Sequence, residues 1–458
     1  MPGASSRCGR QRSLGTRAGT GQVMKLVDFV TTRPGRPMPG SLYAEEARST
    51  EREREPLRAE VTCEVAIVGA GFTGLSTALH LAQMGVDCVV LEANEPGWGA
   101  SGRNGGQINP GLKHGPDEVA ARFGPWAVRF SQDAPDRVFE LVESHQIACD
   151  IRRGGTLRAA TDDIHMAQLR DLAGQMGRHG LPCELLSAED MAHATGTPSY
   201  AGGLFDPKGG QINPLKYARG LAAAVRAQGV AIWSNSPVVK ADEQGGHWTL
   251  TAGEGRVRAR KVLFATNGYT DGLVPRLRRS VIPVFSSILA SAPLPEEMAA
   301  RLLAGGQSLF EVGPVTTYYR VDASLRLIFG GRGRMGDANG PGAFPSLASY
   351  AERLWPGIGQ VGWEYGWNGR VALTQDHYPH VHRYGETGFA CVGFNGRGVA
   401  MATAMGRELA AMLVAGDTHD PVFPTSPIKT IPFQPFWPAG VTPALAWARF
   451  KERIGGAT

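Results

Sequence analysis

Residues 63–93 constrain the fold of this chain more than any other segment, because they combine two apolar runs with a glycine turn and a helical pattern. The apolar runs are Cys63–Val68 and Val86–Leu91, and their β-branched residues predict buried strands. The glycine turn is Gly69–Gly74, and the helical pattern after it ends at Gly85. Together they predict a β-α-β unit that opens an α/β fold.

The glycine turn has the pattern G-x-G-x-x-G, which in this context predicts a dinucleotide site. Gly69 allows the tight turn, Gly71 lets the backbone approach a pyrophosphate, and Gly74 lets the helix pack on the strand. The helix N-terminus offers free N–H groups to the phosphates. Glu92, which follows the second strand, can accept hydrogen bonds from ribose hydroxyls. Its negative charge disfavours a 2′-phosphate, and therefore NADP.

A second glycine-rich segment, GWGASGRNGGQ at residues 97–107, follows almost at once. Ordering glycine costs much entropy, so such a segment is either a linker or backbone that must lie close to a ligand. A nicotinamide enzyme normally continues into further β-α units, and here the glycine-rich segment comes instead. It therefore favours FAD. Its candidate contacts are Ser101, Gly102, Arg103, Asn104, Gly105, Gly106 and Gln107.

The rest of the chain mixes helical and strand patterns. Helical patterns are expected over residues 117–145, 166–176 and 209–230. Residues 231–270 alternate like antiparallel strands, and residues 388–416 repeat the order strand, glycine turn, helix.

Composition excludes several classes of function. The net charge of +5 over 458 residues is local, because Arg7, Arg10, Arg12, Arg17 and Lys25 precede the first acid, Asp28. We therefore expect no nucleic-acid partner. The chain has no run of about 18 apolar residues, so we expect no membrane span. The six cysteines lack zinc-site spacing and predict reduced thiols in the cytoplasm, with no metal site.

The string GASGRNGGQ resembles the D-amino-acid-oxidase-like superfamily of FAD-dependent oxidoreductases, and within it the gamma-glutamylputrescine oxidoreductases. Four further segments carry the resemblance, which covers roughly residues 41–435: SLYAEEA (41–47), KVLFATNGYT (261–270), TYYRVDASLRLIFGG (317–331) and GFNGRGVAMATAMGRELA (393–410).

The resemblance implies an α/β fold with a Rossmann-like FAD-binding domain and a discontinuous α+β substrate domain, whose mostly antiparallel sheet covers the flavin. We expect an extended or disordered lead-in over residues 1–60 and a C-terminal wrap over 421–458. The FAD-binding domain would comprise 61–112, 200–275 and 365–420, and the substrate domain 113–199 and 276–364.

The resemblance also assigns residues to the cofactor. Gly69, Gly71, Gly74 and Glu92 would hold the ADP half, and Ser101 to Gln107 would approach the pyrophosphate and the isoalloxazine. The backbone at Val238 and Val239 would meet the adenine. The residues expected at the pyrimidine end are Gly393, Asn395, Gly396, Gly398 and Val399. There, N–H groups and a helix N-terminus would stabilise the negative charge of reduced flavin.

Departures from the family pattern bear on the substrate. Arg397 replaces a histidine and is open to three roles: a contact to an anionic substrate group, a contact to reduced flavin, or a surface ion pair. Ala400 stands where the sarcosine-oxidase branch has a carboxylate-binding lysine. No cysteine lies near Thr374, where that branch attaches FAD. We therefore expect noncovalent FAD and an amine substrate.

Arg320 and Arg326 lie on the strand pair expected over the flavin, and with Arg397 they are the candidate catalytic residues. Arg326 aligns loosely with the oxygen-activating lysine of the sarcosine-oxidase branch, so fast reaction with oxygen is in doubt. Five aromatic residues are candidates for the wall of a pocket or for core packing: Trp98, Tyr318, Tyr319, Trp363 and Trp367.

The predicted function is oxidation of an amine C–N bond to an imine, which water hydrolyses to an aldehyde and ammonia, with FAD as cofactor and oxygen or a carrier as the electron acceptor. One alternative is a dehydrogenase that uses a carrier protein or quinone. Another is an oxidase of glycine, sarcosine or a D-amino acid, which Ala400 disfavours. A non-enzymatic flavin-binding module is the least favoured alternative.

Overall fold

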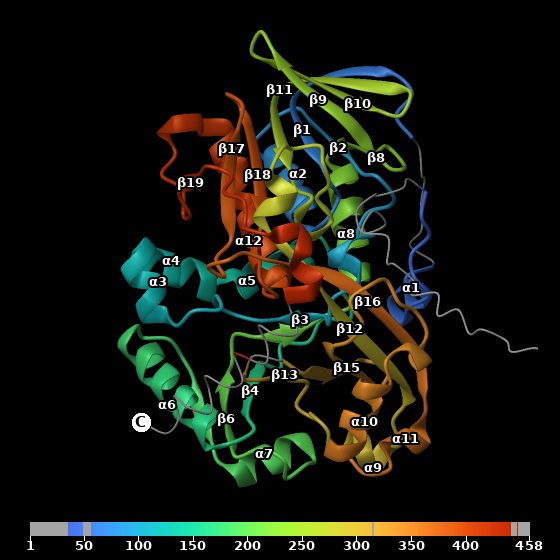
Figure 1. Ribbon diagram of the computed structural model, residues 1–458, viewed down its shortest axis with the longest axis vertical. Helices are drawn as coiled ribbons and strands as arrows, with labels where there is room; N and C mark the ends of the chain where they lie inside the picture. The colour runs from blue at the N-terminus through green and yellow to red at the C-terminus, as the bar shows by residue number, and fades with distance from the viewer. Residues whose placement is uncertain (1–34, 49–55, 314–315, 441–446, 448–458) are drawn as a thin grey trace, which may run out of the picture. The chain divides into compact units, whose positions relative to one another are not determined.

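Two large β-sheets organise the unit from Thr32 to Thr458 (Figure 1). The computed structural model describes residues 35–48, 56–313, 316–440 and 447.

The first sheet is built around the predicted β-α-β unit. Its strand order is β19-β17-β18-β11-β1-β2-β8, with the antiparallel strands β9 and β10 continuing from β11. Neighbours from β18 to β8 run parallel, whereas β17 pairs antiparallel with β18. The bounds are β1 Glu60–Val68, β2 Cys88–Leu91, β8 Ala231–Trp233, β9 Val238–Gln244, β10 His247–Ala252, β11 Gly255–Phe264, β17 His380–Tyr384, β18 Gly388–Val392 and β19 Thr425–Ser426.

Several helices share one apolar core with the first sheet, and four of them supply most of its helical side chains. These four are α2 (Phe72–Gln83), α5 (Ala134–Ser144), α8 (Pro214–Ala227) and α12 (Gly398–Ala415). Side chains from the other face of the sheet form a separate core with those of β9 and β10. Burial on both faces explains why the strands at the centre of the sheet read as continuous apolar runs rather than as alternating patterns.

The second sheet has the strand order β16-β12-β15-β14-β13-β4-β6-β5. The strand β13 pairs parallel with β4, while the other neighbours are antiparallel. Both sheets are therefore mixed. The second sheet departs from the expectation of a mostly antiparallel sheet at the parallel pair of β13 with β4. The bounds are β4 Thr156–Ala160, β5 Glu184–Leu186, β6 Gly202–Asp206, β12 Ile282–Pro293, β13 Ser308–Glu311, β14 Tyr318–Val321, β15 Arg326–Arg332 and β16 Trp363–Leu373.

The helical pattern over residues 117–145 resolves into three helices rather than one. Gly124 lies at φ +90°, between the first helix and the second, and prolines at Pro125 and Pro135 begin new helices. The remaining elements are α3 Pro116–Phe123, α4 Pro125–Gln132, α6 Asp163–Arg178, α7 Ala188–Thr195, α9 Glu296–Ala299, α10 Pro345–Leu354, α11 Ile358–Val361 and the strand pair β3 Gln107–Ile108 with β7 Gly210–Gln211.

The described part of the N-terminal lead-in includes one short packed helix. Ser41 caps the short helix α1 (Leu42–Glu46) by accepting the Ala44 N–H, and Leu42 and Tyr43 are buried. In the C-terminal segment, residues 421–440 include β19 and a short turn of 3₁₀-helix at Gln434–Phe436. Residues 1–34, 49–55 and most of 441–458 lie outside the described residues, and the domain boundaries stay a prediction.

The helix α12 is, within the described ranges, the one helix that is long and apolar enough to cross a membrane by length and composition. Two-thirds of it (67%) is buried inside the protein. Such burial is typical of a core helix, since this helix packs against α2 and α5.

Candidate functional site

A cavity of about 260 Å³ opens at the carboxyl ends of the parallel strands of the first sheet. Its wall includes residues that follow β1, β2, β11 and β18, together with parts of the glycine-rich segment 97–107. Ligands of open α/β sheets bind at this edge, so the topology alone marks the cavity as the candidate site.

The first glycine turn forms one side of the cavity. Gly69 has φ +109°, and a Cβ there would lie 2.9 Å from the carbonyl oxygen of Ala265. Gly71 lines the cavity and is the N-cap of α2, and as a glycine it offers no side chain of its own to the helix N–H groups. A Cβ on Gly74 would collide with the carbonyl of Gly69, so a glycine is needed here for the helix to pack closely on the strand. The turn thus leaves a cradle of open N–H groups that fits a phosphate.

Glu92 lies on the cavity wall at the end of β2. Its carboxylate accepts the N–H of Ala70 at 2.8 Å and the N–H of Asn94 at 3.0 Å. Burial raises the pKa of Glu92, although these two backbone hydrogen bonds lower it in part. The carboxylate oxygens keep further acceptor capacity for hydroxyl groups in the cavity.

The segment 97–107 serves two purposes. Four of its candidate residues line the cavity: Ser101, Asn104, Gly105 and Gln107. The other three are packed within the protein. A Cβ on Gly102 would lie 2.8 Å from Leu215, one on Gly106 would meet the guanidinium of Arg320, and Arg103 lies over the ring of Trp98 at 4.2 Å. These glycines therefore also allow the loop to pack against its own protein.

Asn104 fixes the fold of that loop. Its side-chain amide donates to the carbonyls of Ala100 and Ser101 at 3.1 and 2.8 Å, and its oxygen accepts the Gly106 N–H at 2.8 Å. Ser101 accepts the first N–H of α2, from Phe72, at 3.0 Å. The loop is thus held directly against the first glycine turn.

The C-terminal turn supplies the opposite side of the cavity. Asn395, Gly396, Gly398 and Val399 line it, and Asn395 and Gly396 have φ values of +53° and +86°. Gly393 lies behind the wall, because a Cβ there would collide with the side chain of Thr374. The helix α12 begins at this turn with no side-chain cap among the described residues, so its N–H groups face the cavity end.

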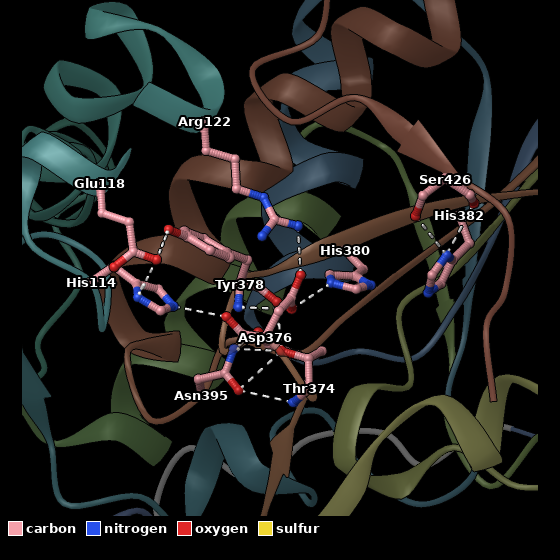
Figure 2. Close-up of polar contacts among 11 residues, drawn as sticks. His114, Glu118, Arg122, Thr374, Asp376, Tyr378, His380, His382, Asn395 and Ser426 are labelled. Carbon is pink, nitrogen blue, oxygen red and sulfur yellow. Dashed lines mark hydrogen bonds and ion pairs between the residues drawn. The ribbon is translucent and has the colours of Figure 1, made fainter. Parts of the chain in front are cut away.

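A polar network behind the wall holds the C-terminal turn (Figure 2). Thr374 donates its N–H to the Asn395 side-chain oxygen at 2.9 Å and its hydroxyl to the carbonyl of Tyr378 at 2.8 Å. Asp376 accepts from Arg122 at 2.7 Å and contacts His380 at 2.9 Å. The network links α3 to the turn and explains how a non-glycine residue is kept at positive φ.

The three predicted catalytic arginines do not line the cavity. Arg320 is buried and donates to the carbonyl of Gly105 at 2.8 Å, to Gln211 at 3.0 Å and to the Tyr43 hydroxyl at 3.0 Å. Arg326 binds Glu364 and the carbonyl of Ser291, so we give it no part in the proposed site.

Arg397 is buried between the cavity-lining glycines 396 and 398, and donates to the carbonyl of Pro110 at 3.3 Å. Its burial excludes the role of a surface ion pair.

Some of the other predicted residues line the cavity, and others do not. Val238 lines the cavity, whereas Val239 is 69% exposed. Trp98 and Tyr318 line the cavity, whereas Tyr319 and Trp367 are fully buried core residues.

Sequence reasoning missed several wall residues. Asn267 and Tyr269 belong to the Thr-Asn-Gly-Tyr turn after β11, and this turn signal was available. Arg370, on β16, gave no local signal. It lies 5.2 Å from the centre of the Tyr269 ring, and the Tyr269 hydroxyl accepts its backbone N–H at 3.3 Å.

Comparison with known proteins decides the family. The family described as DAO, FAD dependent oxidoreductase, matches residues 64–412. This chain belongs to that family. Gamma-glutamylputrescine oxidoreductase of Escherichia coli is 32% identical over 80% of this chain and 86% of its own length. The probable oxidoreductase OrdL of Haemophilus influenzae is 30% identical over 83% of this chain and 90% of its own length.

Solved structures of the DAO family share the fold. The glycine oxidase of Geobacillus kaustophilus gives a TM-score of 0.69 at 21% identity, covering 81% of this chain and 99% of its own. The L-alpha-glycerophosphate oxidase of Mycoplasma pneumoniae, a structure with FAD bound, gives 0.64 at 17% identity, covering 80% and 99%. This DAO-family protein is thus an enzyme that uses FAD, and the glycine cradle, the acidic residue after β2 and the two helix N-termini at the cavity fit that cofactor.

Proposed function

We propose that this protein is an amine oxidoreductase that converts a CH–NH₂ or CH–NH group to an imine, with a gamma-glutamylputrescine-like substrate. The observation that carries the proposal is the similarity to gamma-glutamylputrescine oxidoreductase across 80% of the chain. A cavity bounded by both glycine turns and by the second sheet supports it.

The proposed cofactor contacts follow the cavity wall. Gly69, Gly71 and the N-terminus of α2 would hold the diphosphate, and Glu92 the ribose. Backbone at Val238 would meet the adenine. The turn from Asn395 to Val399 would hold the pyrimidine end of the flavin. When bound, FAD supplies the acceptor for the hydride that leaves the carbon next to the amine nitrogen.

The protein itself would contribute a partial positive charge at the cavity end and an aromatic wall for the substrate. The N-terminal end of α12, an 18-residue helix, carries a partial positive charge that stabilises an anion at the cavity end. The rings of Trp98, Tyr269 and Tyr318 line the cavity and suit the apolar part of an amine. Tyr318 is fixed by a hydrogen bond of 2.8 Å to Ser286. A fixed aromatic wall orients a substrate without needing to move.

We also propose that FAD is held noncovalently. The cysteines of the described residues are Cys63, Cys88, Cys149, Cys183 and Cys391, and none of these lines the cavity. Acid precipitation of the yellow protein tests this, since noncovalent FAD is released to the supernatant whereas a thioether-linked flavin stays with the pellet.

The alternative of a simple amino-acid oxidase has less support in the geometry. Ala400 is fully buried in α12 and does not line the cavity, so it offers no charge to a carboxylate next to the reacting carbon. The electron acceptor, oxygen or a carrier, and the cytoplasmic location stay predictions.

Anaerobic titration of the holoenzyme tests the proposal. The panel is gamma-glutamylputrescine, putrescine, sarcosine, glycine, proline and D-alanine, and the readout is loss of the oxidised flavin absorbance. Bleaching by either of the first two amines alone supports the proposal, and bleaching by an amino acid alone overturns it. Admission of air afterwards separates an oxidase from a dehydrogenase.

A further inference from the structure

A buried cluster of charges lies beside the cavity and has no part in the site described so far. It consists of Arg158 on β4, Asp206 on β6 and Arg397 at the start of α12. All three side chains are at least nine-tenths buried, with residue exposures of 7%, 1% and 7%. Two guanidinium groups therefore share one carboxylate in a largely buried place.

The cluster is poorly paired for its burial. Arg158 and Asp206 approach only to 3.7 Å, and the Arg158 Nε and Asp206 Oδ2 atoms have no hydrogen-bond partner among the described residues. Arg397 donates to the carbonyl of Pro110 at 3.3 Å. A guanidinium has five N–H donors, so most of the donors in the cluster have no hydrogen-bond partner within the part of the chain that the structure describes.

An aromatic ring holds the two arginines near each other. The guanidinium carbon of Arg397 lies 4.7 Å from the centre of the Phe310 ring, and that of Arg158 lies 5.8 Å from it. Burial lowers the pKa of Arg397 to about 9, and the charge of Arg158 adds to the decrease while Asp206 opposes it. Arginine keeps its proton in proteins, so such a site is stabilised by an anion rather than by deprotonation.

Strand register places the cluster on the cavity side of the second sheet. Tyr318, which lines the cavity, pairs with Phe310, and Phe310 pairs with Arg158. Directly paired residues point to the same face of a sheet. Arg158 therefore lies two strands from Tyr318, or about 10 Å at ordinary strand spacing.

Two contacts connect the cluster with the cavity wall. Asn109 lines the cavity and accepts the hydroxyl of Thr156 at 3.2 Å, on the same strand as Arg158. The next residue, Pro110, provides the carbonyl that binds Arg397. The cluster thus lies directly behind one end of the cavity.

We propose that Arg158 and Arg397 bind a carboxylate at the end of the substrate that is remote from the oxidised C–N bond. This inference rests on the proposed function. A carboxylate balances the excess positive charge and accepts from both guanidinium forks. In a gamma-glutamyl diamine, about nine bonds separate the reacting carbon from the α-carboxylate, or roughly 10 Å when extended. A bare diamine would instead bring a second cation to two arginines.

Binding of non-oxidisable probes tests this inference separately from oxidation. The probes are gamma-glutamyl-n-butylamide, which lacks the reacting amine, and the same molecule with its α-carboxylate converted to a carboxamide. Calorimetric titration of the holoenzyme is expected to show at least about 10-fold tighter binding of the carboxylate probe. Equal affinity for the two probes, or binding of neither, overturns the inference even if amines are oxidised.

Substitutions assign the effect to the cluster. In Arg158→Met and Arg397→Met, the preference for the carboxylate probe is expected to fall to within about 2-fold, with the carboxamide probe still bound as a check on folding. The matched control is Arg153→Met, since Arg153 also lies over a phenylalanine ring, Phe139 at 4.4 Å, but is exposed. A preference that survives in both cluster variants overturns the inference.

Discussion

Arg320 donates its Nε–H to the carbonyl of Gly105 at 2.8 Å, across 215 residues of sequence. We therefore infer that this residue, predicted to act in catalysis, instead positions the glycine-rich loop. Its two terminal nitrogens donate to Gln211 and Tyr43, so each of the three guanidinium nitrogens is bound within the protein.

Substitution of Arg320 by methionine is expected to loosen that loop. We expect FAD affinity to fall about 10-fold or more, together with a loss of roughly 2–4 kcal/mol in the free energy of unfolding, because three buried acceptors lose their donor. The measurements are flavin-fluorescence titration of the apoprotein and denaturant unfolding. Arg320→Lys should recover part of the affinity. If FAD affinity is unchanged while stability falls, Arg320 does not position the loop.

Glu92 should make FAD binding depend on pH. Because burial raises the pKa of Glu92, and hydrogen bonds from ribose hydroxyls favour its ionised form, FAD binding should release protons. Affinity should therefore rise as the pH increases through the raised pKa, which lies above the ordinary value of about 4.3 for glutamate. Dissociation constants measured between pH 4.5 and 7.5 check this.

The variant Glu92→Gln is the control for that effect. It should bind FAD roughly 10-fold to 100-fold more weakly at pH 7 and lose most of the pH dependence, since an amide carries no titrating charge. A wild-type affinity that does not change with pH would contradict the assignment of Glu92 to the ribose.

Gly71→Ala tests the cradle at the start of α2. The added methyl would lie 2.9 Å from the Ser101 hydroxyl and would occupy the side of the turn that faces the cavity. We expect loss of bound FAD after purification, with little change in secondary structure by circular dichroism. The control is Gly177→Ala, at an exposed position of α6 with open space around it, which should retain FAD and gain up to about 1 kcal/mol of stability.

Asp376 should contribute to stability at neutral pH and lose that contribution in acid. Burial raises its pKa, but the hydrogen bond and charge of His380, helped by the Tyr378 N–H and the charge of Arg122, outweigh burial and leave the pKa below the ordinary value. A carboxyl with a lowered folded pKa stabilises the protein above its unfolded pKa of about 3.9 and loses this effect as the pH falls through the folded pKa. Asp376→Asn should cost about 1–3 kcal/mol at pH 7.

The measurement for Asp376 is urea unfolding of both proteins at several pH values. The difference between the wild type and Asp376→Asn should shrink below about pH 4. A difference that stays constant from pH 7 to pH 3 would show that the charge of Asp376 is not what stabilises the turn.

Local sequence predicted those parts of the site that local geometry determines. Gly69, Gly71 and Glu92 could be found because a strand, a turn and a helix follow one another within 30 residues. Residue roles that depend on tertiary contacts could not be found in this way. Gly102 and Gly106 share a motif with Gly105, yet they pack against Leu215 and Arg320.

The second sheet shows the same limit. Its strand order joins β13 to β4 in parallel across about 150 residues, and no local pattern encodes that pairing. Local sequence therefore offered no reason to predict a role for Arg158. Its partners Asp206 and Phe310 lie on strands that are distant from it in the sequence. Arg326 was predicted as a catalytic residue but does not line the cavity, because alternation along a strand does not say which of its residues face the cavity.

The contacts around Arg320 also have a consequence for folding. Its bonds to Gly105 and Tyr43 join positions 215 and 277 residues apart, so the glycine-rich loop gains its final support only after α1, β14 and the loop have met. Contacts of such long range form late and slowly. Nascent protein should therefore acquire its flavin near the end of folding, and the yellow colour marks a chain whose distant segments have already assembled.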